Sequence, residues 1–234
     1  MLTQFGCYVT GTDTEIGKTL VSTAMLYALA QTGVQAVGMK PVAAGATLRD
    51  GIWHNDDVDQ LISASNIKVP TTLSAPYVLR EAAAPHIAAA QQGIEIDVHH
   101  ICDCFSMLSK LSNAVVVEGV GGFRVPLSDR YDTADMAQLL DLPVVVVVGL
   151  RLGCLNHALL TVEAIAARGL ILAGWVANVV DANMRFGEDN VDALSARIHA
   201  PLLGCVPHLP VASAAATAAC LDFTVLPGWP GRAI

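Results

Sequence analysis

The 234-residue chain contains little charge, few aromatic side chains and no long apolar run. Charged residues make up 15% and aromatic residues 5% of a sequence that is 53% hydrophobic. The 13 basic residues are outnumbered by 21 acidic ones, which gives a net charge of -8 and argues against nucleic acid or an anionic membrane as partner. No apolar run approaches the roughly 20 residues of a membrane-spanning helix. The low charge fraction favours a thick, fully covered sheet and is compatible with an oligomer that hides further surface.

We also expect no secretory signal peptide. An apolar, strand-like run begins at Phe5, without the basic start and apolar stretch of a secretory signal peptide. The six cysteines are scattered along the sequence, at positions 7, 102, 104, 154, 205 and 220. In a chain of this class we expect reduced thiols and a cytoplasmic location.

Strand-like and helix-like segments alternate along the chain. Strands are expected at residues 5–9, 35–39, 114–118, 144–148, 171–179 and 202–206, and helices at residues 20–29, 56–64, 86–92, 98–111, 132–140, 156–168 and 187–199. Residues 40–55 and 70–85 show no period and are expected to be irregular, and the last few residues to be poorly ordered. The pattern predicts one α/β domain over residues 1–234, a single doubly wound, mostly parallel sheet flanked by helices. Together with the phosphate-binding loop described next, it indicates a fold of the P-loop NTPase type.

A phosphate-binding loop is predicted between the first strand and the first helix. It contains Gly17, Lys18 and Thr19 directly before the helix, where backbone N–H groups and the helix dipole favour an anion. The spacing is unusual, because five residues separate Gly11 from Gly17 instead of four. In such a loop Lys18 would reach the β- and γ-phosphates and the Thr19 hydroxyl would bind Mg²⁺.

The strand ends predict what surrounds this loop. Ligands of doubly wound sheets gather at the carboxyl ends of the strands, where Lys40 and Glu118 are expected. Glu118 ends an apolar strand, so its carboxylate needs a cation, such as Mg²⁺ with nucleotide, or another positive group. One acid of the pair Asp56 and Asp57 would complete a set of oxygen ligands with Thr19.

Seven motifs in a fixed order resemble those of the ATP-dependent dethiobiotin synthetases. They cover most of residues 5–210 and lie at residues 9–19, 40–43, 117–122, 126–128, 148–158, 174–178 and 201–204. The five-residue spacing of the phosphate loop is this family's own form. The string Gly153-Cys154-Leu155-Asn156-His157 is the most specific of the motifs.

The resemblance implies a ligase that uses ATP, Mg²⁺, CO₂ and 7,8-diaminononanoate. It implies that a carbamate of the substrate attacks the γ-phosphate, and that the second amine then closes a ureido ring. It also implies a homodimer in which the distal carboxylate of the substrate is held near the subunit interface.

The resemblance also assigns roles to residues. The implied catalytic residues are Thr14, Lys18 and Lys40, and the implied Mg²⁺ ligands are Thr19, Asp57 and Glu118. ATP is expected to contact Glu15, Ile16, Gly17, Lys18, Thr19, Leu20, Asp57, Glu118, Gly119, Val120, Gly121, Asn178, Val179, Pro207, His208 and Leu209. The substrate is expected to contact Thr14, Lys40, Ala44, Gly153, Cys154, Leu155 and Asn156.

Two departures and two alternatives accompany the resemblance. Many relatives carry Ser or Thr where this chain has Ala44, and the sequence after Pro210 matches poorly.

One alternative is an amidoligase similar to cobyrinate diamide synthase, but 234 residues leave no room for its glutaminase domain. The other is a ParA/MinD-like ATPase, which usually has a lysine where this loop has Gly11 and Thr12. ATP turnover that needs a small diamine, not a macromolecule, would exclude the second alternative.

Overall fold

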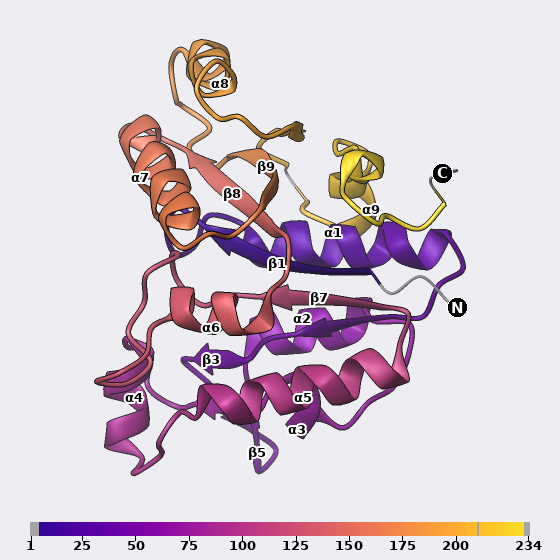
Figure 1. Ribbon diagram of the computed structural model, residues 1–234, viewed down its shortest axis with the longest axis vertical. Helices are drawn as coiled ribbons and strands as arrows, with labels where there is room; N and C mark the ends of the chain where they lie inside the picture. Colours follow the sequence, from indigo (N-terminus) through magenta and orange to yellow (C-terminus); the bar gives the residue numbers. More distant parts are fainter. Residues whose placement is uncertain (1–4, 210, 232–234) are drawn as a thin grey trace.

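A computed structural model describes residues 5–209 and 211–231 of the chain, and its centre is a six-stranded parallel sheet (Figure 1). The strand order is β10-β9-β8-β1-β7-β2. The strands are β1 (Phe5–Gly11), β2 (Ala36–Met39), β7 (Ala114–Glu118), β8 (Val144–Leu150), β9 (Leu172–Val179) and β10 (Leu202–Val206). The doubly wound parallel sheet predicted from the sequence is therefore confirmed.

The central strands are apolar because both faces of the sheet are covered. Every residue of β7 and β8 is buried, including the five consecutive valines 144–148. Continuous apolar runs are typical of strands in covered parallel sheets. In the register of β1 with β7, Val9 lies opposite Glu118, so the end of β7 is beside the loop that follows β1.

Helices pack on the two faces of the sheet in separate layers. One face carries α1 (Lys18–Gln31), α2 (Asp56–Ala64), α9 (Ala214–Ala218) and the 3₁₀ turn Phe223–Val225. The other carries α3 (Thr71–Ser74), α4 (Pro85–Gln91), α5 (Val98–Leu111), α6 (Thr133–Leu140), α7 (Cys154–Ala167) and α8 (Gly187–Ser195). Within the described residues, no helix has both the length and the apolar character to cross a membrane.

The expectation that residues 40–55 and 70–85 lack regular structure was wrong. They contain β3 (Val42–Ala44), β4 (Thr47–Arg49), β5 (Ile52–His54), α3 and β6 (Tyr77–Leu79). Strands β3 and β6 pair in parallel, while β4 and β5 form a hairpin whose turn residues Asp50 and Gly51 have positive φ. Three-residue strands are too short for their hydrophobic period to be recognised, and the pairing of β3 with β6 is not local.

Helix ends differ from the predicted ones by a few residues. Helix α7 begins at Cys154, two residues before its predicted start, because Gly153 supplies a left-handed N-cap at φ 96°. Helix α8 ends at Ser195, four residues before its predicted end. The predicted disorder of the last few residues concerns residues 232–234, which lie outside the described residues.

Candidate active site

The phosphate loop lies between β1 and α1. Gly17 adopts φ 89° at the start of α1, a left-handed conformation that favours glycine. A Cβ atom at this position would also lie 2.2 Å from Nδ2 of Asn178. That amide donates a hydrogen bond of 2.8 Å to the Ile16 carbonyl, so the end of β9 holds the loop from the side. This contact explains why the loop has a glycine directly before Lys18.

Lys18 is a buried cation at the first position of α1. Its ammonium donates a hydrogen bond of 2.7 Å to the carbonyl oxygen of Asp13. Burial, followed by repulsion from Lys40, lowers the pKa of Lys18 to about 8. The attraction of an anion in the loop would offset both effects and favour the charged ammonium, as expected of a phosphate site.

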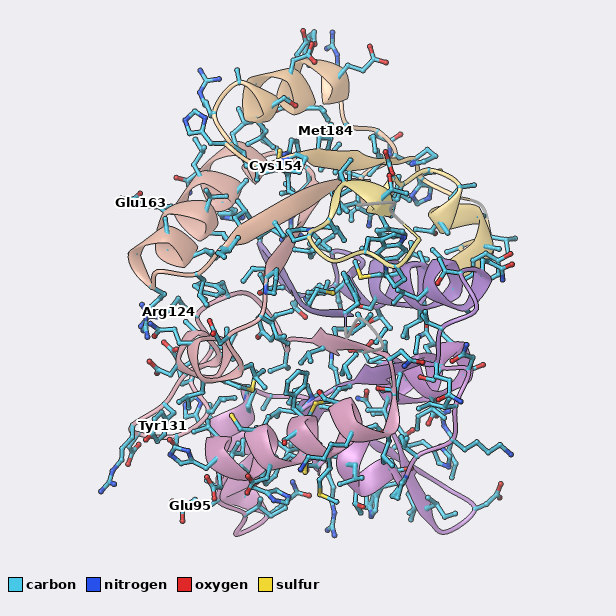
Figure 2. The ribbon with its side chains drawn as sticks, turned by 45° about the vertical axis from the view of Figure 1, so that its right-hand side comes forward. Glu95, Arg124, Tyr131, Cys154, Glu163 and Met184 are labelled. Carbon is cyan, nitrogen blue, oxygen red and sulfur yellow. The ribbon has the colours of Figure 1, made fainter. Side chains whose placement is uncertain are left out.

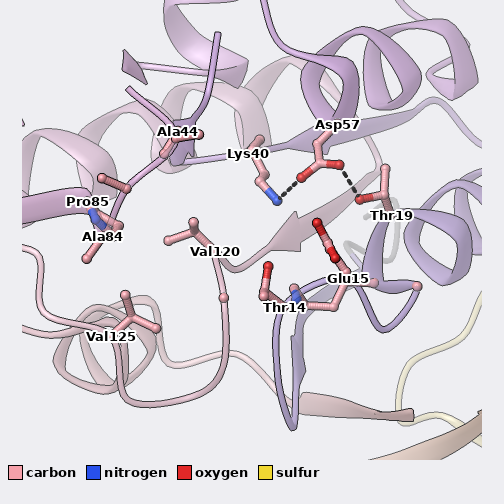
Figure 3. A pocket seen from close by; sticks show the side chains of 15 residues that line it. Thr14, Glu15, Thr19, Lys40, Ala44, Asp57, Ala84, Pro85, Val120 and Val125 are labelled. Atoms are coloured by element: carbon pink, nitrogen blue, oxygen red, sulfur yellow. Dashed lines mark hydrogen bonds and ion pairs between the residues drawn. The ribbon is translucent and has the colours of Figure 1, made fainter. Parts of the chain in front are cut away.

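Lys40 follows β2 and lies between the carboxylates of Asp57 and Glu118, and Figure 3 draws its ion pair with Asp57. Its ammonium is 2.6 Å from Oε1 of Glu118 and 2.7 Å from Oδ2 of Asp57, and it donates to the Gly119 carbonyl at 3.2 Å. Burial opposes the charge on Lys40, but the attraction of Glu118 and Asp57 outweighs it and raises the pKa of the ammonium. Burial of Asp57 favours its neutral form, but the attraction of the Lys40 ammonium outweighs burial and lowers the pKa of the Asp57 carboxyl.

Thr19 completes this cluster. Its hydroxyl lies 2.8 Å from Oδ1 of Asp57 and 2.8 Å from Oε1 of Glu118. Oε2 of Glu118 is buried and has no hydrogen-bond partner among the described residues. Hydroxyl and carboxylate oxygens around one point, with an unsatisfied carboxylate oxygen, suit a hard cation such as Mg²⁺. Within residues 5–209 and 211–231, no group of three or more His, Cys, Asp and Glu side chains could hold a metal. Such an ion would therefore need the Thr19 hydroxyl and phosphate oxygens in addition to the two carboxylates.

The structure distinguishes the two neighbouring acids of α2. Asp57 faces Thr19 and Lys40, whereas Asp56 is 74% exposed and pairs with Arg49. Asn55 caps the helix as predicted, because its side-chain oxygen accepts from the N–H groups of Asp57 and Val58. Its amide group also donates to the carbonyl of Ala44 at 3.0 Å. Asn55 therefore connects β3 to the helix that carries Asp57.

A cavity of about 750 Å³ opens over this cluster (Figure 3). Its lining includes ten residues predicted from the sequence: Thr14, Glu15, Gly17, Lys18, Thr19, Lys40, Ala44, Asp57, Val120 and Gly121. Sequence reasoning missed the opposite wall, which consists of Ala82, Ala83, Ala84, Pro85 and Val125. These side chains are small or apolar and have no functional group that would indicate a role in a site. The proline in this segment was the only sequence feature that indicated a defined backbone conformation.

Other predicted contact residues lie around or apart from the cavity. Asn178 and Val179 end β9, and Asn178 touches the loop while Val179 lines a separate cavity of about 570 Å³. The three residues that follow β10 are exposed or half-buried: Pro207, His208 and Leu209. Gly153, Cys154, Leu155 and Asn156 form the start of α7, where Figure 2 labels Cys154, and do not line the cavity over the phosphate loop. Ile16 and Leu20 flank the loop, with Ile16 buried and Leu20 half-buried.

Comparison with known proteins relates this arrangement to a family of enzymes. A family described as an AAA domain matches residues 6–216. The chain is also 62% identical over 234 residues to the ATP-dependent dethiobiotin synthetase BioD of Janthinobacterium sp. (strain Marseille), a match that covers 98% of this chain and 99% of that protein.

Solved structures with low sequence identity share the fold. The septum site-determining protein MinD of Pyrococcus horikoshii OT3, complexed with Mg-ADP, aligns with a TM-score of 0.56 at 17% identity, over 95% of this chain and 88% of that chain. A ParA family ATPase from Chlorobium tepidum TLS aligns with a TM-score of 0.54 at 14% identity, over 89% and 86% of the two chains. These similarities establish the P-loop architecture, and the near full-length similarity establishes the more specific relationship. The chain belongs to the family of ATP-dependent dethiobiotin synthetases, which are ligases of biotin biosynthesis with a P-loop fold.

Proposed function

We propose that the cavity over the phosphate loop converts 7,8-diaminononanoate, CO₂ and ATP into dethiobiotin, ADP and phosphate. One amine of the substrate takes up CO₂ and forms a carbamate. A carbamate oxygen then attacks the γ-phosphorus of ATP, which releases ADP and leaves a mixed carbamic–phosphoric anhydride. The second amine attacks the carbonyl carbon, which closes the ureido ring and expels phosphate.

The observation that carries this proposal is the position of Lys40. Its ammonium lies at the carboxyl end of the sheet, beside Thr19 and facing the same cavity as Lys18. Phosphoryl transfer between two anions depends on positive charge placed between them. Lys40 and Lys18 are the cations that line this cavity. We assign Lys40 to the carbamate and Lys18 to the phosphates, with Thr14 beside the carbamate.

Thr19, Asp57 and Glu118 are the proposed ligands of Mg²⁺. When bound, the ion supplies positive charge to the triphosphate of ATP. The three side chains fit this role because their oxygens lie together: the Thr19 hydroxyl contacts both carboxylates, and both carboxylates pair with the ammonium of Lys40. Without a cation between them, these carboxylates and the phosphates of ATP would repel one another.

The remaining contacts of ATP are assigned to the loop and to the ends of three strands. The phosphates are proposed to lie against the backbone of residues 15–20, with Gly119, Val120 and Gly121, which follow β7, beside them. Asn178 and Val179 are proposed to contact the adenine edge, with Pro207, His208 and Leu209 lining the base. Support for this placement comes from Asn178, whose side chain touches the loop at the Ile16 carbonyl.

The wall opposite the phosphate loop is proposed to hold the carbon chain of the substrate. Ala44, Pro85, Val120 and Val125 offer an apolar surface across from Lys40. Apolar walls with a few polar groups are typical of small-molecule sites. The substrate amines would then face Thr14 and Lys40 while the chain extends away from ATP.

A homodimer is proposed to complete the substrate site. The start of α7 carries the motif assigned to the distal carboxylate, yet it does not line the cavity of its own subunit. The helix is rich in apolar residues, but only Cys154, Ala158 and Ile165 are buried. Leu152 and Leu160 are 97% and 57% exposed. Such exposed apolar side chains suit a partner surface, so the turn of one subunit would serve the cavity of the other.

We place this enzyme in the cytoplasm.

The proposal is tested by ADP release from purified enzyme with MgATP and bicarbonate, with and without 7,8-diaminononanoate. We expect ADP release that depends on the diamine, together with dethiobiotin detected by mass spectrometry. A monoamine analogue, 7-aminononanoate, serves as the matched control, because it can form a carbamate but cannot close the ring. ADP release at the same rate with and without the diamine, or the absence of dethiobiotin when the diamine is present, would contradict the proposal.

A further inference from the structure

Arg151 and Asp13 join two loops that are 138 residues apart in the sequence. The guanidinium of Arg151 donates from Nη2 to Oδ2 of Asp13, and the two side chains are 44% and 37% exposed. Arg151 directly follows β8, and Asp13 lies in the phosphate loop after β1. The function proposed above gives neither side chain a role.

Asp13 contacts two groups that are assigned to the reaction. Its Oδ1 accepts a hydrogen bond of 2.8 Å from the N–H of Thr14, and its carbonyl oxygen accepts one of 2.7 Å from the Lys18 ammonium. The backbone just before it is fixed to β8, because Thr12 N–H donates to the carbonyl of Val147 at 3.1 Å. A displacement of Asp13 would therefore move both Thr14 and Lys18.

Arg151 belongs to the turn that starts α7. Its carbonyl accepts a hydrogen bond of 3.0 Å from the N–H of Cys154, the first residue of the helix. Gly153 closes this turn in a left-handed conformation. The backbone that is assigned to the distal carboxylate of the substrate is thus one turn away from the guanidinium that holds Asp13.

We propose that Arg151 is a positioning residue that, through Asp13, couples the carboxylate-binding turn of residues 153–156 to the phosphate loop. This inference rests on the proposed function. If the turn serves the cavity of the other subunit, the ion pair connects the phosphate loop of one active site to the substrate turn of its neighbour. In this role Arg151 is proposed to act through Asp13, without contact to ATP or the substrate.

A double-mutant cycle tests the coupling. The variants are Arg151→Gln, Asp13→Asn, the double variant and Arg151→Lys, with Arg197→Gln as control because Arg197 is an exposed arginine that contacts the Ala193 carbonyl of α8. For each, the KM for ATP, the KM for 7,8-diaminononanoate and kcat are measured, together with the dissociation constant of a non-hydrolysable ATP analogue with Mg²⁺. The melting temperatures establish that the variants fold.

We expect Arg151→Gln and Asp13→Asn each to raise both KM values by about two- to fivefold, the range of partly exposed ion pairs. The double variant should be no worse than either single one, and Arg151→Lys should recover part of the loss. The sign of the Asp13→Asn effect is decisive. Removal of a negative charge beside the phosphates would tighten ATP binding through simple electrostatics, whereas loss of positioning weakens it.

Three results would overturn the coupling. The first is an Asp13→Asn variant with unchanged KM values beside an Arg151→Gln variant with raised ones, which would mean that Arg151 contacts a ligand directly. The second is additive losses in the double variant. The third is a set of effects equal to those of Arg197→Gln. If the unmodified enzyme shows no diamine-dependent turnover, the proposed function fails. The cycle of dissociation constants for the ATP analogue then still decides whether the pair positions the phosphate loop.

Discussion

The Lys40 ammonium lies 2.6 Å from Oε1 of Glu118, and the two side chains are 3% and 0% exposed. A buried carboxylate without a partner is strongly unfavourable, so Lys40 supplies the charge that Glu118 needs. The same ammonium also pairs with Asp57, and the Thr19 hydroxyl contacts both carboxylates, so Lys40 touches two of the three proposed Mg²⁺ ligands. Lys40 is therefore the positive charge that both carboxylates of this cluster share.

We predict that Lys40→Ala abolishes most of the turnover but retains the binding of MgATP. Because the substitution leaves Glu118 buried and unpaired, it should also lower the free energy of unfolding by about 3–5 kcal/mol without metal. Mn²⁺ should bind more tightly to Lys40→Ala than to the unmodified enzyme in the absence of nucleotide, as measured by electron paramagnetic resonance. Lys110→Ala, on the exposed side of α5, is the control. Turnover within a few-fold of the unmodified enzyme would contradict the role of Lys40.

Substitution of Gly153 should weaken substrate binding specifically. Its φ of 96° is strained for valine, although a Cβ atom there would meet nothing within 4 Å in the same subunit. We expect Gly153→Val to distort the turn and to raise the KM for the diamine about tenfold or more. Gly169→Val is a matched control, since Gly169 also has positive φ and open space around it but lies beyond the other end of α7. Equal KM values for the two variants would exclude the turn from substrate binding.

Ala44→Ser should improve substrate affinity. The side chain of Ala44 faces the cavity, and the Asn55 amide fixes its backbone. An added hydroxyl that donates to the substrate is worth about 0.5–1.5 kcal/mol, which corresponds to a KM lower by about two- to tenfold. The KM for ATP and the melting temperature should not change. A KM for the diamine that stays the same or rises would show that the hydroxyl has no partner in this enzyme.

The N-terminus of α6 should make stability dependent on pH. Partial burial opposes the ionisation of Asp135, but the backbone N–H of Asp132 and the Arg168 guanidinium outweigh it and lower the pKa of Asp135. Because the pKa is lower in the folded protein, the stabilisation is complete above the unfolded pKa of about 3.9 and is lost as pH falls through the folded value.

Asp135→Asn should therefore lower the free energy of unfolding by about 1 kcal/mol at pH 7, the size of a typical helix cap. The difference from the unmodified enzyme should shrink as pH falls from 5 toward 3. Urea unfolding at several pH values measures it, with Asp103→Asn on the exposed side of α5 as control. A difference that is constant across this range would exclude the charge of Asp135 as its cause.

The sequence predicts those parts of the molecule that depend on local patterns. The valine runs of β7 and β8 indicate buried parallel strands, and the rule that ligands gather at strand ends predicts that Lys40 and Glu118 lie near the phosphate loop. Both are as expected in the structure. The cap at Asn55 is also predicted correctly, because its hydrogen bonds join neighbouring residues.

Features that depend on contacts between residues far apart in the sequence cannot be predicted from local patterns. The pairing of β3 with β6 and the wall formed by residues 82–85 arise from short segments without a hydrophobic period. The ion pair of Arg151 with Asp13 joins residues that separately resemble ordinary loop charges. The roles assigned to residues of the site stay predictions, because each role is defined by a contact with ATP or with the substrate.

The most direct test of the account follows oxygen from CO₂ into phosphate. If the carbamate attacks the γ-phosphorus, the bridging oxygen of the anhydride comes from CO₂ and leaves with the phosphate. The enzyme is given MgATP, 7,8-diaminononanoate and ¹⁸O-labelled bicarbonate, and the phosphate is examined by ³¹P nuclear magnetic resonance before the label exchanges with water. We predict one ¹⁸O atom in each phosphate released during dethiobiotin formation. Unlabelled phosphate, with the label still present in bicarbonate, would contradict phosphoryl transfer to a carbamate in the cavity beside Lys40.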